Sequence, residues 1–281
     1  MDARRESAVI LSYCKGDGRS RRCFSGEFNS IEDFLIHPKK GERKMEDSLR
    51  VVQKELGKTE REKRRMERRR QLNLPIYSVG EEVFSSVTHG AGALLAAAAL
   101  VCLLVFSPHT PLNVVSLSIY GGTMFLLYTV STLYHALGIT KAKKVFQILD
   151  HCTIFLLIAG TYTPVLLLGI GGLLGWIFFV AIWAAAALGI VLNAVDMNRF
   201  KKLSLVSYIC MGWSAVLVMR PLFDRLTILE MVFLLAGGIF YTVGAVLYGK
   251  GGRIPYMHSV WHLFVLAGSA SHFLLIWQLA V

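Results

Sequence analysis

Seven long apolar stretches dominate the second part of this chain and restrict its fold more than any other feature. Each has about the 20 predominantly apolar residues that an α-helix needs to cross a membrane. They lie at 87–106, 114–136, 146–168, 172–195, 203–221, 226–247 and 258–279. The 281-residue chain is 54% hydrophobic with a mean hydropathy of +0.51, too apolar for an ordinary soluble domain. We therefore predict an all-α membrane protein built as a seven-transmembrane helix bundle.

Residues 1–80 differ from the rest, because they hold no long apolar run and carry 20 Lys and Arg against 13 Asp and Glu. This predicts a polar, basic cytoplasmic region at 1–80, partly disordered or helical, followed by a seven-helix transmembrane domain at 81–281. The charge-dense segment 44–71 is typical of a solvated helix, which can also touch anionic lipid headgroups. We expect membrane lipids as partners and no nucleic acid, since no aromatic residues are interleaved with the charge.

Lysine and arginine are shared unevenly among the short loops between the apolar stretches. The loops after the second, fourth and sixth stretches hold three, three and two of them. The loops after the first and third hold none, and the loop after the fifth holds Arg220 and Arg225. Basic residues are retained on the cytoplasmic side. We therefore predict that the N-terminus is cytoplasmic and the C-terminus outside.

With this orientation, several ionisable groups fall in the cytoplasmic half of the membrane. His258 and His262 open the last apolar stretch four residues apart, so both imidazoles lie on one helical face. Ser131 and His135 close the second stretch with the same spacing, and Asp150 opens the third. Ionisable groups inside a membrane are costly unless they have partners, so this layer indicates a functional site.

Three neutral imidazoles with an open fourth position form the arrangement of a catalytic zinc site, in which bound water has a pKa near 7. We predict that His135, His258 and His262 ligate zinc. Asp150 is expected to orient the water or take its proton, and Ser131 to belong to the site. The five cysteines show no CxxC spacing, so they indicate neither a disulfide framework nor a cysteine zinc site.

Other interpretations stay open for some of these residues. A single histidine near a helix end more often bonds a backbone carbonyl or reaches the interface, as we expect of His151 and His272. His89 opens the first stretch, and two interpretations of it stay open. It has either a supporting or interfacial role at the start of the helix, or a place in the site. Asp150 follows three lysines, so it could form an ion pair at the membrane interface instead of belonging to the zinc site.

Five separated motifs occur in order along about residues 75–281. They are Glu81-Glu82 through Thr88-His89-Gly90, Ser131-Thr-Leu-Tyr-His135, Asp150-His151 through Pro164, Met211-Gly-Trp213, and His258-Ser-Val-Trp-His262 through Gly268. In these motifs the chain resembles the hemolysin III family, the bacterial branch of the progestin and adipoQ receptor superfamily. That family usually has Asn where this chain has Ser85.

The resemblance implies a seven-helix bundle in the bacterial inner membrane, with zinc held by His135, His258 and His262. It also implies that Ser131 and Asp150 lie nearby through water. The adiponectin-receptor branch is associated with hydrolysis of the ceramide amide. The resemblance therefore implies a zinc-dependent hydrolase with a lipid-like substrate.

Two other functions stay open. The first is a non-enzymatic sensor or receptor-like protein in which zinc is structural, which a closed four-ligand site would favour. The second is a pore-forming cytolysin, as the family name suggests. The polar groups cluster at one end of the stretches, which argues against a pore made by one chain, and the oligomeric state stays open.

Overall fold

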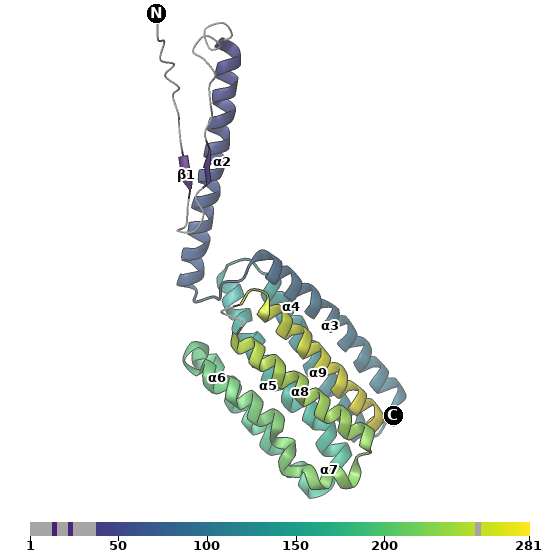
Figure 1. Ribbon diagram of the computed structural model, residues 1–281. Helices are drawn as coiled ribbons and strands as arrows, with labels where there is room; N and C mark the ends of the chain where they lie inside the picture. The colour runs from purple at the N-terminus through teal and green to yellow at the C-terminus, as the bar shows by residue number, and fades with distance from the viewer. Residues whose placement is uncertain (1–12, 16–21, 25–37, 251–253) are drawn as a thin grey trace, which may run out of the picture. The chain divides into compact units, whose positions relative to one another are not determined.

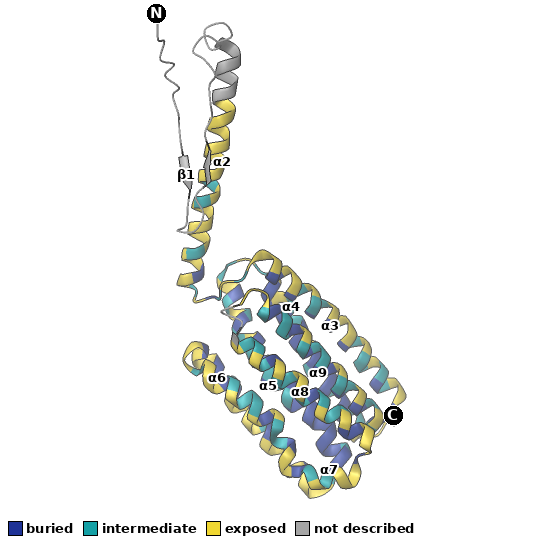
Figure 2. Ribbon diagram, viewed as in Figure 1, coloured by how far each residue is buried: buried dark blue, intermediate teal, exposed yellow. Residues whose placement is uncertain are grey.

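The structure is a computed structural model that describes residues 13–15, 22–24, 38–250 and 254–281. The chain divides into two compact units, Met1–Glu67 and Arg68–Val281. In the first unit the strands β1 (Tyr13–Lys15) and β2 (Arg22–Phe24) pair antiparallel. Helix α2 (Pro38–Gln71) covers the predicted segment 44–71, and most of its described side chains are exposed (Figure 2). The predicted disorder concerns residues that lie largely outside the described ranges.

The second unit is a bundle of helices that run side by side (Figure 1). Its elements are α3 (Val79–Phe106), α4 (Pro111–Ala136), α5 (Lys141–Pro164), the π-helix η1 (Val165–Ile170), α6 (Gly172–Gly212), the 3-10 helix η2 (Trp213–Val218), α7 (Met219–Arg225), α8 (Ile228–Lys250) and α9 (Met257–Ala280). Among the described residues, six helical segments are long and apolar enough to cross a membrane. The count is six where the sequence predicts seven, because the stretches 172–195 and 203–221 both fall within one segment of 54 residues.

That long segment is not one straight helix. Asp196 has non-helical dihedral angles (φ −156°, ψ 88°), and its carboxylate accepts the backbone N–H groups of Asn198 and Arg199 at 3.1 and 3.0 Å, as an N-cap does. Ser204 donates to the side chain of Asn193 at 2.6 Å, although eleven residues of straight helix would separate them by about 16 Å. The chain therefore folds back at Asp196. Figure 1 shows the reversal within α6.

Helix α5 with η1 lies at the centre of the bundle. In the apolar window of Lys141–Ile170, 78% of the residues are buried, against 50% or less in the other five segments. Large apolar side chains on the outer helices are exposed, as a surface facing lipid requires. Regular α-helix ends at Pro164, which lacks the N–H that a helix interior needs.

The packing of α3, α4, α5 and α9 positions the polar groups. Helix α3 packs against α4 and α9, and α4 packs against α5. Contacts such as Ser85 to Ser259, at 3.1 Å between hydroxyl oxygens, place the start of α3 beside the start of α9. Lys143, in the first turn of α5, donates to the carbonyls of Tyr134 and Leu137 at the end of α4. One end of the bundle therefore collects the start of α3, α5 and α9 and the end of α4.

Candidate metal centre

Three histidines meet at this end of the bundle, as the sequence predicts. His135 comes from the last turn of α4, and His258 and His262 come from the first two turns of α9. Each offers a ring nitrogen, and the three nitrogens all lie within 4.8 Å of one another. The Nε2 atoms of His135 and His258 are 3.3 Å apart, and those of His258 and His262 are 3.2 Å apart. All three side chains are buried.

These distances fit a shared cation. Zinc lies about 2.0–2.1 Å from imidazole nitrogen, so two ligands of a tetrahedral site are about 3.3–3.4 Å apart. Hydrogen bonds alone do not explain the cluster, because an imidazole nitrogen has either one hydrogen or one lone pair in the ring plane. The Nε2 atom of His258 cannot make good hydrogen bonds to both neighbours. The histidine group could therefore hold a metal ion.

Glu82 on α3 supports this group, a role that was not predicted from the sequence. Its Oε2 atom accepts from Nδ1 of His135 and from Nζ of Lys143, each at 2.9 Å. Its Oε1 atom accepts from Nη2 of Arg69 at 3.4 Å. The sequence offers one signal, since the two adjacent carboxylates Glu81 and Glu82 come just before the first apolar stretch. Ser78 and Glu81 form a capping box, which leaves Glu82 without a capping role.

Asp150 and Ser131 are buried at the same end of the bundle. Ser131 lies one turn before His135 on α4, and Asp150 lies on α5. Asp150 is not part of the group of close ligand atoms, and it lines a neighbouring pocket. The roles of these two residues stay predictions.

His89 lies beside the three histidines. Its ring centroid is 3.7 Å from that of His262, and Tyr128 contacts it edge-on at 5.0 Å. Within the described part of the chain neither of its ring nitrogens has a hydrogen-bond partner. His151 and His272 bond the carbonyls of Gln147 and Leu234, as expected of structural histidines.

Tyr77 covers the cluster from the segment before α3. Its ring stacks on His258 with a centroid distance of 4.6 Å and an interplanar angle of 17°. The guanidinium of Arg69 donates to the carbonyls of Pro75 and Tyr77 and so holds this segment in place. Burial raises the pKa of Tyr77 well above its usual value, so its phenol stays neutral.

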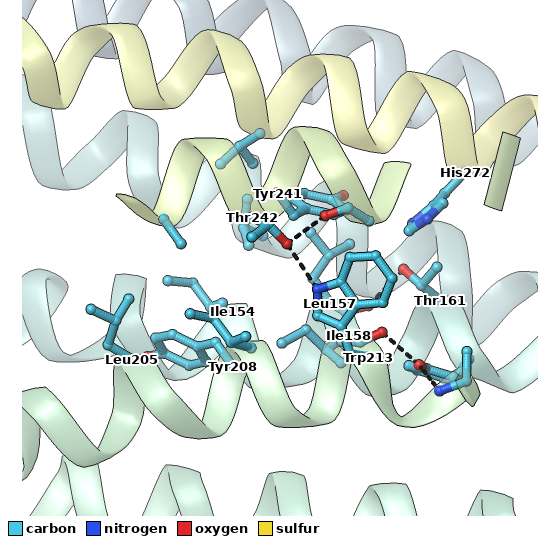
Figure 3. A pocket seen from close by; sticks show the side chains of 18 of the residues that line it. Ile154, Leu157, Ile158, Thr161, Leu205, Tyr208, Trp213, Tyr241, Thr242 and His272 are labelled. Atoms are coloured by element: carbon cyan, nitrogen blue, oxygen red, sulfur yellow. Dashed lines mark hydrogen bonds between the residues drawn. The ribbon is translucent and has the colours of Figure 1, made fainter. Parts of the chain in front are cut away.

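An apolar pocket adjoins the histidines. It encloses about 1390 Å³ of empty space, counting the part open to the outside, and His89 and Asp150 line it. The lining follows α5 from Asp150 and continues to Val165 at the start of η1, about 22 Å along the helix axis. In Figure 3, Ile154, Leu157 and Ile158 line this space. Its length and apolar lining suit a hydrocarbon chain better than a polar solute.

Comparisons with known proteins show what this chain is similar to. The family model described as Haemolysin-III related matches residues 77–273, which include all three histidines. The chain is 46% identical to Hemolysin-3 of Bacillus cereus over 197 residues, covering 69% of this chain and 90% of the relative. It is 40% identical to the Hemolysin-3 homolog of Bacillus subtilis (strain 168) over 200 residues, covering 70% and 93%. It is 32% identical to the human monocyte to macrophage differentiation factor over 165 residues, covering 57% and 68%.

Proposed function

Since the chain belongs to the hemolysin III family and is a multi-pass membrane protein, we propose that its histidine group holds zinc and that it hydrolyses a lipid amide. The observation that carries this proposal is the spacing of the Nε2 atoms, which lie 3.3 Å apart between His135 and His258 and 3.2 Å apart between His258 and His262, beside an apolar pocket. Imidazole also suits copper, iron and nickel. The buried carboxylate of Glu82 is hydrogen-bonded to His135, and zinc-binding histidines usually have such a partner.

The proposal includes the topology. A straight helix of 54 residues would be about 81 Å long, against a hydrocarbon core of about 30 Å. The reversal at Asp196 supports two crossings in this segment, and seven in all. The basic loops support an N-terminus and a histidine site on the cytoplasmic side, and we propose the bacterial inner membrane as the location.

Each residue has a defined part in the proposed reaction. When bound, zinc would polarise the amide carbonyl and acidify a water molecule. The imidazoles of His135, His258 and His262 would hold the metal. Asp150 takes a proton from the water as the water oxygen bonds the carbonyl carbon, and returns that proton to the amine nitrogen as the C–N bond breaks. Ser131 orients the same water through its hydroxyl. The apolar pocket holds the acyl chain and keeps bulk water from the carbonyl.

A second candidate function is a sensor in which zinc is structural. The observation that favours it is the burial of all three histidines, with Tyr77 stacked on His258, which limits their access to solvent. A third candidate is a cytolysin, because the names of the Bacillus relatives refer to haemolysis. Release of dye from liposomes by the purified chain would identify such a cytolysin.

The first experiment measures metal content and lipid-amide hydrolysis on the same detergent-purified protein. We expect about one zinc per chain in the wild type, as one three-histidine site predicts. The His258→Ala/His262→Ala double variant should lose both the zinc and the activity. His272→Ala is the control for zinc content alone, because His272 lies on the same helix about 15 Å from His262 but also lines the pocket.

Three results would contradict parts of the proposal. Zinc without hydrolysis of any lipid amide would favour the sensor. A folded wild type that takes up no metal would remove the metal centre. Loss of zinc in the His272→Ala variant would show that the double variant had lost its fold rather than its ligands.

A further inference from the structure

Glu82 lies at the centre of a buried charge cluster next to the histidines. Its two carboxylate oxygens contact His135, Lys143 and Arg69. Its side chain is 10% exposed, and those of Lys143 and Arg69 are each 3% exposed. A buried carboxylate is stable only when charges and hydrogen bonds compensate it, and these three donors supply both.

The contact with His135 fixes which ring nitrogen of His135 carries the hydrogen. An ionised carboxylate only accepts hydrogen bonds, so Nδ1 of His135 must donate to it over the 2.9 Å distance. In a neutral imidazole the other nitrogen then has a lone pair. That nitrogen is Nε2, the atom that faces His258 at 3.3 Å. Glu82 thereby prepares His135 to bind a metal.

Lys143 and Arg69 hold the carboxylate in this position. Lys143 bonds Oε2 and also the carbonyls of Tyr134 and Leu137. These carbonyls belong to the end of α4, the helix that carries His135, so the carboxylate and the imidazole have a common support. Arg69 occupies the other oxygen. Both oxygens are thereby bound to donors, which holds Glu82 away from the position of a fourth ligand.

We propose that Glu82 is a positioning residue for the metal centre: it fixes the tautomer and orientation of His135, while Lys143 and Arg69 keep its carboxylate out of the coordination sphere. This inference rests on the proposed metal centre, but not on lipid-amide hydrolysis. It explains how the site keeps an open position beside a buried carboxylate, as a catalytic site needs and a closed structural site does not.

The first test compares Glu82→Gln with Glu81→Gln in full-length protein. Glu81 is the neighbouring buried carboxylate on the same helix, and its oxygens accept the backbone N–H groups of Ser78 and Tyr256. Zinc affinity, measured by competition with a chelator, should fall about 10- to 100-fold in Glu82→Gln. Zinc affinity should change less than about twofold in Glu81→Gln. Loss of the Glu81 hydrogen bonds should instead lower the unfolding temperature. Equal affinities in the two variants would overturn the inference.

The second test needs no variant of Glu82 and no bound metal. Nitrogen-15 NMR of histidine-labelled, metal-free wild type should show His135 with hydrogen on Nδ1 and a bare Nε2. The signal is assigned by its loss in His135→Phe. Hydrogen on Nε2 of His135 in the folded protein would overturn the inference even if Glu82→Gln did not fold.

The two tests separate this inference from the proposed function. If Glu82→Gln weakens zinc binding but no lipid amide is hydrolysed, the positioning role stands and the hydrolase proposal fails. If a lipid amide is hydrolysed and the zinc affinity of Glu82→Gln equals that of the wild type, the positioning role fails and the hydrolase proposal stands. If the folded wild type binds no zinc, both fail.

Discussion

Asp150 is the single residue on which the hydrolase proposal depends most. It is a buried carboxylate that lines the apolar pocket, close to the histidine end of the bundle. We expect Asp150→Asn to lower the rate of lipid-amide hydrolysis by about 10²–10⁴-fold, the usual contribution of a general base. Zinc content should not change, because Asp150 is outside the group of close ligand atoms.

Asp224→Asn is the control for this prediction, since Asp224 is an exposed carboxylate on α7. It should keep the full rate. An unchanged rate in Asp150→Asn would show that another group takes the proton, and the proposed role of Asp150 would be wrong.

The histidine group was predictable from the sequence and its support was not. The i,i+4 spacing of His258 and His262 fixes a common face whatever surrounds the helix, and the loop charges put His135 at the same depth. Glu82 gives no such periodic signal. Its role depends on how α3 rotates against α4 and on where the side chain of Lys143 reaches, and both are set by tertiary packing.

At the scale of helices, close packing around small residues holds the bundle together. A Cβ atom on Gly189 of α6 would lie 2.3 Å from the ring of Phe155 on α5, a ring that is fully buried. We expect Gly189→Ala to destabilise the protein by about 1–3 kcal/mol, because the buried ring cannot move away. Thermal unfolding in detergent measures this effect.

Gly122→Ala is the matched control for the packing prediction. Gly122 lies inside α4, and nothing lies within 4 Å of a Cβ atom built there. This change should be neutral or stabilising by up to about 1 kcal/mol, from helix propensity alone. If both variants unfold at the same temperature, the contact between α5 and α6 is looser than described.

The apolar stretches predicted that helices exist, but not how each helix is interrupted. The stretch 172–195 and the stretch 203–221 are distinct in sequence because charged residues separate them. In the structure helical geometry continues through those charges except at Asp196, so one long segment replaces two. The pocket could not be predicted from the sequence either, because its lining comes from residues on several different helices.

For the molecule as a whole, the distribution of polarity supports a site reached from within the membrane. The apolar pocket extends along α5 from the histidine end, and the outer helix faces are apolar and exposed. A lipid can move from such a surface into an apolar pocket without crossing water. A water-soluble substrate would need a polar path to the histidines. At the end of the bundle where the histidines lie, Tyr77 stacks on His258 and obstructs such a path.

The number of membrane crossings can be tested by locating the two ends of the chain. Seven crossings place the N- and C-termini on opposite sides, whereas six would place them on the same side. In the full-length protein we expect an N-terminal tag to be protected in intact cells. A phosphatase fused after Val281 should be active, because that enzyme matures only outside the cytoplasm. A fluorescent protein fused there, which folds only inside, should stay dark.

A tag inserted after Phe200 tests the reversal directly. Phe200 lies four residues beyond Asp196, where the chain folds back and where Arg199, Lys201 and Lys202 gather. If the segment crosses twice, this tag should be reached by protease only in inside-out vesicles, as the N-terminal tag should be. If the segment crossed once as a continuous helix, the tag would be shielded by lipid in both vesicle orientations. Both ends would then be found on one side, and the seven-crossing proposal would be wrong.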